Sequence, residues 1–201
     1  MVKLVYFLGT LAASGLSVFG IRAAYDQPAY RVVRRLAADV EIRAYAPRVM
    51  VETSMAGESE GEAFGRLFRY ITGANQGKAM IAMTVPVEQA PQRIAMTVPV
   101  ETQGGTEMMR FYLPPSVAAA GAPQPTEKGV HLVALPAVTM GVVRFSGSLT
   151  EASRAFQTAR LRTVLEQAGK PASGNPLYLS YDPPFTVPFL RRNEVALQIT
   201  P

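Results

Sequence analysis

The chain has 201 residues, of which 48% are hydrophobic and 17% are charged, and its net charge is +5. This composition excludes a disordered chain and suits one domain with a sizeable core. The lack of cysteine excludes disulfides and thiolate catalysis, and the single histidine excludes a multi-histidine metal centre. The basic pairs Arg34-Arg35 and Arg191-Arg192 are scattered and have no interleaved aromatic residues, so we expect no nucleic-acid partner.

An apolar run over residues 4–21 follows Lys3 and ends at Arg22. Its length lies between that of a signal-peptide core and that of a short membrane span. Cleavage after Ala24 would leave Arg22 where a small residue is preferred, which favours an uncleaved anchor. We therefore interpret residues 1–24 as a signal peptide or an N-terminal membrane anchor. In either case we expect the domain of residues 30–201 on the periplasmic or another extracytoplasmic side.

The first half of this domain predicts two strands and a helix. Apolar residues alternate over residues 40–44 and 49–53, with Pro47 between the two runs. A capping box of Ser59 and Glu62 then predicts the start of a helix, and Gly73 fits its end. The apolar positions of this helix fall on one face, at Ala63, Phe64, Leu67, Phe68 and Ile71.

The eight letters IAMTVPVE occur twice, at residues 81–88 and 94–101, separated by QAPQR. In each copy Ile, Met and two Val residues fall at alternate positions, which predicts a strand with one apolar face. Pro86 and Pro99 each lack a backbone donor, so we expect edge strands or bends there. The separation suits a hairpin loop. We expect a hairpin over a pocket, with Met83 and Met96 at equivalent positions.

The remaining sequence predicts more strands and a second helix. RFYLP reads as a strand, PPSVAAAGAPQPTEKG as a surface loop, and residues 130–147 as two strands. Ser148 and Glu151 form a second capping box, which predicts a helix that ends at Gly169. LYLSYDPPF is interpreted as a turn region and NEVALQI as a final strand.

A larger repeat relates residues 40–57 to residues 130–147. Both segments predict two strands that lead into a capped helix, and four residues recur at an offset of ninety: Val, Ala, Met and Gly at 40, 44, 50 and 57. We therefore predict an α+β fold, a distorted antiparallel β-barrel from two pseudo-symmetric ββαββ-like halves flanked by two helices. A groove between sheet and helix is the expected ligand site.

The combination of YITGAN, MTVPV and YDPP…RRNEV resembles the SOUL family of haem-binding proteins. Further matching segments are VEIRAYAP, RFYLPP and VVRFSG, and the resemblance extends over residues 30–199. The doubled MT-x-PV hairpin is similar to the bacterial branch of the family. The resemblance implies the SOUL haem-binding fold and non-covalent binding of haem or a related tetrapyrrole in an apolar groove along the first helix. An axial protein ligand is not required.

The resemblance implies that the groove of this chain lies on the first helix. At the position of Gly61 some family members have Arg. A porphyrin needs a flat apolar slot and cations for its propionates. The predicted cofactor-binding residues are Phe64, Leu67, Phe68, Arg69, Met83 and Met96. The alternative is that the helix stripe is simply core.

His131 and the methionines are weaker candidates for ligating the haem iron. His131 alternates with Val130 and Leu132, so we interpret it as a strand-surface residue. Methionine near the hairpin is more typical of gap-filling core than of ligation.

No nucleophile, base or acid is arranged for catalysis, so we predict no enzyme and no metal site. The predicted function is tetrapyrrole binding for buffering, transport or delivery. The alternative is a structural or interaction module without its own ligand, tethered beside a membrane protein complex by the N-terminal helix. An effector-sensing domain ranks last.

Overall fold

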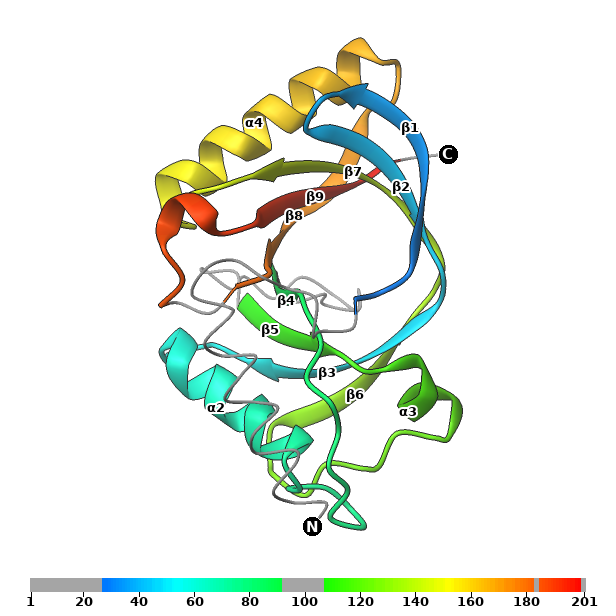
Figure 1. The fold of residues 1–201 in the computed structure, drawn as a ribbon, viewed down its shortest axis with the longest axis vertical. Helices are drawn as coiled ribbons and strands as arrows, with labels where there is room; N and C mark the ends of the chain where they lie inside the picture. The colour runs from blue at the N-terminus through cyan, green and yellow to red at the C-terminus, as the bar shows by residue number, and fades with distance from the viewer. Residues whose placement is uncertain (1–26, 92–106, 183–184, 200–201) are drawn as a thin grey trace, which may run out of the picture.

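A nine-stranded antiparallel sheet is the frame of the computed structural model, which describes residues 27–91, 107–182 and 185–199 (Figure 1). The strands are β1 Tyr30–Ala37, β2 Val40–Tyr45, β3 Arg48–Ser54, β4 Val87–Pro91, β5 Glu107–Tyr112, β6 Val130–Leu135, β7 Val138–Phe145, β8 Ala172–Ser180 and β9 Asn193–Ile199. The helices are α2 Glu60–Ile71, α3 Pro115–Ala119 and α4 Glu151–Gln167, and the 3-10 turn η1 covers Pro188–Leu190.

The strand order is β1-β2-β7-β9-β8-β4-β5-β3-β6, and every neighbouring pair is antiparallel. The predicted α+β class with an antiparallel sheet is therefore confirmed. In the described part of the chain β1 and β6 end this order and do not pair with each other. Closure into a barrel, as predicted, is not observed in these pairings.

Two long bent strand pairs, β2–β3 and β6–β7, cross from one half of the sheet to the other. Their ladders keep one register across the bend, because Tyr45 pairs with Val138 and Arg48 pairs with Leu135, the same step on both strands. Pro47 and Pro136 lie inside the interruption, where a residue without an N–H costs no ladder bond. The strand–strand–helix unit predicted from the repeat is thus present twice, as β2-β3-α2 and β6-β7-α4.

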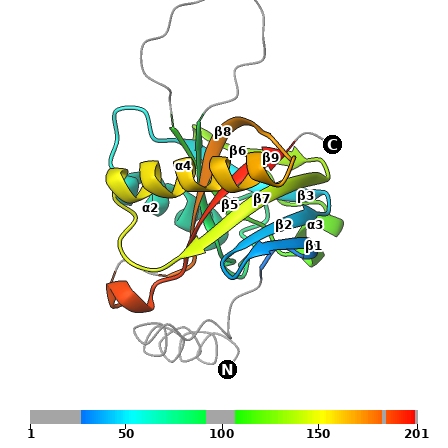
Figure 2. The ribbon, with the colours of Figure 1, turned by 90° about the horizontal axis from the view of Figure 1, so that it is seen from above.

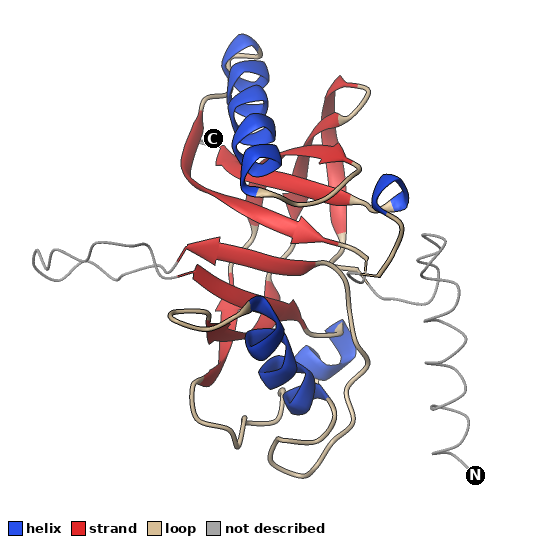
Figure 3. Cartoon of the chain, turned by 90° about the vertical axis from the view of Figure 1, so that its left-hand side faces the viewer, coloured by secondary structure: helices blue, strands red, loops and turns tan. Residues whose placement is uncertain are grey.

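Each half of the sheet carries one long helix on its outer side. Seen from above, α4 lies across β7, β8 and β9 (Figure 2). A side view shows α4 and α2 at opposite ends of the molecule, with the strands between them (Figure 3). Leu161 and Leu165 of α4 are fully buried against Val143, Val195 and other residues of β2, β7 and β9.

The core under α2 follows the predicted stripe in part. Ala63, Leu67 and Ile71 are buried as expected, whereas Phe68 remains exposed. The predicted capping box is present: the Ser59 hydroxyl accepts from the backbone N–H of Glu62, and the Glu62 carboxylate accepts from that of Ser59. These two bonds satisfy donors that a helix start leaves open.

The first IAMTVPVE copy is not a strand over its length, which corrects the prediction. Only its end belongs to β4, which begins at Val87. Ile81 packs into the core under α2 and Val85 into a separate cluster with Tyr45 and Val142. The alternating pattern therefore serves an irregular segment that contributes to two cores. The second copy, with Met96, lies outside the described residues.

Three further predictions are corrected. The cap of α4 is Thr150 rather than Ser148, because the Thr150 side chain accepts from the N–H of Ser153. The predicted surface loop after β5 contains the short helix α3, which begins with Pro115 at a position where no helical N–H is needed. The predicted turn region LYLSYDPPF begins inside β8.

Among the described residues, no helix combines the length and the apolar character that a membrane span requires. The predicted signal peptide or anchor at residues 1–24 lies outside those residues and stays a prediction.

Gly141 provides a test of the packing between β7 and α4. A Cβ at this position would lie 2.6 Å from both methyl carbons of Leu165, which is fully buried. We expect Gly141→Ala to lower the free energy of unfolding by about 1–3 kcal/mol, because the leucine has no room to move. Denaturant unfolding measures the change.

Gly65→Ala is the matched control. Its Cβ would meet only the end of the flexible Arg69 side chain at 3.6 Å, inside a helix. We expect a gain of about 0.5–1 kcal/mol from the lower helix cost of alanine. Equal losses at both glycines would contradict the packing argument.

Candidate ligand-binding site

The predicted groove residues of α2 lie at different depths. Leu67 is fully buried (0% exposed) and packs into the core beneath the helix, together with Tyr70. Phe64 is half-buried against the same core. Leu67 therefore presents no side-chain surface to a ligand. Phe64 presents the part of its side chain that remains exposed.

Phe68 is the exposed aromatic residue of this face. Its ring stacks on Phe64 with centroids 6.1 Å apart and an interplanar angle of 14°. Phe64 in turn meets the edge of Phe111 from β5 at 5.1 Å. The side chain of Phe68 is 43% exposed. These rings form a continuous aromatic path from the core to the surface, and its outer end is open to a flat partner.

Arg69, the predicted cation, is paired with Glu127. Its Nε and Nη2 donate to the two carboxylate oxygens of Glu127 at 3.0 and 2.5 Å. The bond with Glu127 raises the pKa of Arg69 above its ordinary value, and the same bond lowers the pKa of Glu127. The guanidinium of Arg69 therefore lies at the end of α2, as predicted for a propionate partner, but it is bound to a carboxylate of this chain.

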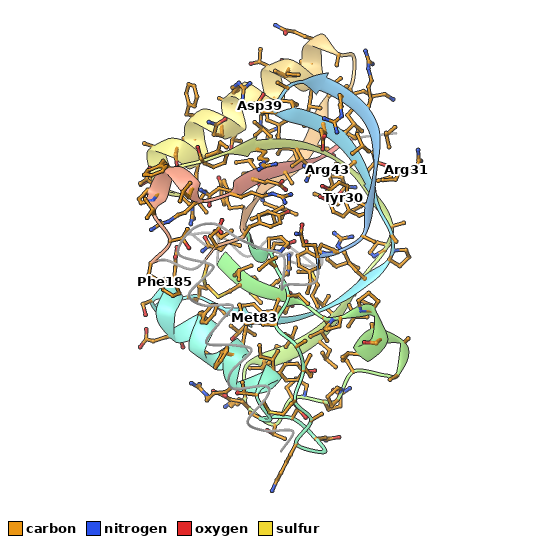
Figure 4. All side chains as sticks on the ribbon, viewed as in Figure 1. Tyr30, Arg31, Asp39, Arg43, Met83 and Phe185 are labelled. Carbon is orange, nitrogen blue, oxygen red and sulfur yellow. The ribbon has the colours of Figure 1, made fainter. Side chains whose placement is uncertain are left out.

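The loop after α2 is fixed by Asn75 of the YITGAN motif. Its buried amide donates to the carbonyls of Tyr70 and Ala79 and accepts from the N–H of Ala79. The chain then passes Met80, which is 70% exposed. It reaches Met83, which is half-buried against the α2 core (Figure 4). The structure thus brings Met83 to the same core as Phe64 and Leu67.

His131 occupies the place that strand alternation predicts. It is exposed, whereas Val130 and Leu132 on either side pack into the α2 core. The interpretation of His131 as a strand-surface residue is therefore confirmed.

Sequence reasoning missed a set of exposed phenylalanines on the other half. Phe156 of α4, Phe185 and Phe189 of η1 are all more than half exposed. The N–H of Gly147 donates to the carbonyl of Pro188, which ties η1 to the segment before α4. Phe185 lies at the left edge of Figure 4, in a segment that carried part of the SOUL resemblance. The resemblance of that segment to the family was the signal in the sequence that could have drawn attention to these phenylalanines.

Sequence reasoning also missed a charged network on the concave face of the sheet. Glu194 is fully buried and accepts from Arg43 at 2.8 and 3.2 Å, from Arg192 at 2.6 and 3.0 Å and from the Tyr181 hydroxyl at 2.8 Å. Burial by itself would raise the pKa of Glu194, but the adjacent Arg43 and Arg192 outweigh it and leave the pKa lowered. Figure 4 shows Arg43 with Tyr30 inside the curve of the sheet, and its guanidinium lies 4.4 Å from that ring.

The other half has an equivalent cluster. Buried Glu88 accepts from Arg110 at 2.9 Å and from the Tyr112 hydroxyl at 2.7 Å, and Arg110 also donates to Glu52 at 2.7 Å. Burial, together with the charge of Glu88, raises the pKa of Tyr112 well above its ordinary value. Alternation alone assigns such strand positions to solvent, which is why these groups were not predicted to be buried.

Two cavities open on this concave face, with volumes of about 320 and 380 Å³. Arg110, Leu135 and Pro136 line both, and His131 lines only the second. No residue of α2 lines either cavity. The structure therefore separates the predicted α2 surface from the two cavities.

Comparison with protein families gives one assignment. The model of the SOUL heme-binding protein family matches residues 25–198. Among curated relatives, Heme-binding protein 1 of Xenopus tropicalis is 31% identical over 160 residues, which cover 77% of this chain and 80% of the relative. Heme-binding protein 1 of Mus musculus is 28% identical over 153 residues, covering 74% and 76%.

Solved structures share the fold at low identity. An uncharacterized conserved protein from Listeria innocua matches with a TM-score of 0.59 and 10% identity, covering 81% of this chain and 92% of that one. The EcmrR C-terminal domain matches with a TM-score of 0.52 and 11% identity, covering 85% and 98%. At these identities the likeness concerns the fold alone.

Arg43 and Arg48 differ in their partners, and this predicts different roles in stability. Arg43→Met would leave Glu194 buried with one cation fewer, so we expect a loss of about 3–5 kcal/mol in the free energy of unfolding. Arg48 has no carboxylate within ion-pair distance among the described residues, so Arg48→Met deprives no buried carboxylate of its partner. We expect its effect to stay below about 1 kcal/mol. Urea unfolding of both variants measures the two changes. Similar losses of unfolding free energy in the two variants would contradict the assigned network.

Proposed function

Because the chain belongs to the SOUL haem-binding protein family, we propose that it binds haem or a related tetrapyrrole non-covalently in an apolar groove along α2. The family match over residues 25–198 carries this proposal. The relatives named Heme-binding protein 1 support haem as the ligand class. In this proposal binding is non-enzymatic and serves buffering, transport or delivery.

The aromatic path on α2 supports the position of the groove. A tetrapyrrole is a large flat apolar ring, and the exposed face of Phe68 offers it a stacking surface that Phe64 and Phe111 hold from behind. Met83, half-buried against the same core, provides an adaptable wall. Leu67 contributes from beneath by anchoring the helix, and we propose Met96 as a further wall residue.

Arg69 supports the polar end of the groove. Its guanidinium already makes a two-point contact with a carboxylate, Glu127, in the geometry that a haem propionate would adopt. Since an exposed ion pair is weak, a propionate can replace Glu127 at little cost. Gly61, at the opposite end of α2, has no side chain to add a second cation, so in this proposal Arg69 is the cation that α2 supplies.

Residues 1–24 suggest where this binding takes place. As a signal peptide or an N-terminal membrane anchor they would bring the domain to the periplasmic or another extracytoplasmic side, beside a membrane. In the alternative function, the same tether would hold a structural or interaction module at a membrane complex. A chain that binds no porphyrin yet co-purifies from membranes with a stoichiometric partner would favour that alternative.

Haemin titration of the domain of residues 30–201 tests the proposal, read by the Soret band and by quenching of tyrosine fluorescence. We expect Phe68→Asp to weaken binding by tenfold or more, because a charge would enter an apolar contact. The fold should tolerate the change at this exposed position. His131→Ala is the control and should bind as the wild type does. Normal binding by Phe68→Asp together with loss in His131→Ala would refute the groove.

The competition between Glu127 and a propionate gives a second test. Glu127→Gln should tighten haemin binding severalfold, because it releases Arg69 from its internal partner. Arg69→Gln should weaken it, and the double variant should resemble Arg69→Gln. If Glu127→Gln weakens binding, or has the same effect in the absence of Arg69, the propionate is not held there.

A further inference from the structure

Arg48 is a cation on the concave face that has no anionic partner among the described residues. Its Nη1 donates to the carbonyl oxygen of Pro136 at 3.4 Å. Its Nε is buried and has no hydrogen-bond acceptor in the part of the chain that the structure describes. By contrast, Arg43, Arg110 and Arg192 on the same face each donate to at least one glutamate. A buried N–H of a charged group without an acceptor is costly, and it points to a partner that binds from outside the chain.

The surroundings of Arg48 hold it in place for such a partner. Its guanidinium lies 5.3 Å from the centre of the Tyr45 ring and 5.8 Å from that of Tyr112. The nearby carboxylate of Glu88 is fully used, since one oxygen accepts from Arg110 and the other from Tyr112. Arg48 is therefore fixed between two aromatic rings, and Glu88 is not available to neutralise it.

The cavity beside Arg48 has two kinds of wall. Arg48 lines the space of about 320 Å³ together with the polar side chains of Ser173 and Asn175. Its apolar wall includes Val138, Met140 and Leu177. This volume is at the lower end of the range for small-molecule sites. Arg110 and Glu88 also line the space, but they pair with each other. Arg48 is therefore the cation left for a ligand, and together with the apolar wall it selects an amphipathic anion.

We propose that this cavity binds a small organic carboxylate with an apolar chain, whose carboxylate pairs with Arg48. The guanidinium fork suits a carboxylate, and the chain would lie along Val138, Met140 and Leu177. This site is separate from the α2 groove, because no α2 residue lines the cavity. It does not depend on haem binding.

Calorimetric titration of the full-length protein with sodium octanoate tests the proposal. We expect saturable binding with one site, at least tenfold weaker binding of the uncharged analogue 1-octanol, and at least tenfold weaker octanoate binding in Arg48→Gln. Arg48→Lys keeps the charge but loses the fork, so it should fall between the two. Arg31→Gln, at an exposed arginine of β1, is the matched control and should bind as the wild type does.

A site-specific measurement keeps the proposal testable even if Arg48→Gln does not fold. In spectra of methyl-labelled methionine, octanoate should shift the resonance of Met140, which lines the cavity, and leave that of Met83, beside α2, in place. Saturating haemin should leave octanoate affinity unchanged within twofold. Absence of octanoate binding, full retention in Arg48→Gln, or a shift at Met83 alone would each overturn the proposal.

Discussion

The register shared by the two bent strand pairs is the constraint on which the rest of the structure depends. β2 and β3 stay in step with β7 and β6 across the interruption at Pro47 and Pro136, so both chains change direction at the same level. The sheet therefore curves as one body, and each half keeps a concave and a convex side. The convex sides receive α2 and α4, whereas the concave sides face a shared interior.

This arrangement explains why the protein buries charge. Strand residues that alternate with the helix-facing core point into the curve, where Glu88 and Glu194 lose all contact with water. Each pairs with arginine and also accepts a hydrogen bond from a tyrosine hydroxyl. Such clusters contribute little net stability but are costly to break in part, so they favour one arrangement of the strands over others. The aromatic face of α2, where we propose that the ligand binds, and the charged interior thus lie on opposite faces of the same strands.

Local periodicity was enough to predict much of this fold. α2 with its Ser59 cap, the paired strands at each end of the repeat and the final strand all follow from short-range pattern. The predictions that failed concern segments whose structure depends on residues far away in the sequence. Residues 177–180 were predicted to begin a turn region, yet they belong to β8, where β9 pairs with them on one side and β4 pairs with residues 178–180 on the other. The first IAMTVPVE copy alternates like a strand, but its apolar residues supply two cores.

The candidate site likewise has features that local sequence pattern predicts and features that depend on distant residues. Spacing identified the stripe of α2, but it could not separate buried Leu67 from exposed Phe68, because that depends on which residues of the stripe pack against the core. It could not show that Glu127 already holds Arg69 either, since 58 residues separate the two in sequence. The family resemblance supplied the ligand class, which no local pattern contains. Three-dimensional structure was needed to reveal that Arg48 has no carboxylate partner within residues 27–91, 107–182 and 185–199.

Successive side chains of β5 point to opposite faces of the sheet, and this limits which sequence changes the protein can accept during evolution. Phe111 supports the aromatic path on α2, while its neighbours Arg110 and Tyr112 hold Glu88 in the interior. Inserting or deleting a single residue in β5 would exchange the two sets, with arginine under the helix and phenylalanine among the carboxylates. Length changes should therefore be absent from β5 in natural homologues, and the outer and inner surfaces can diverge only by substitution.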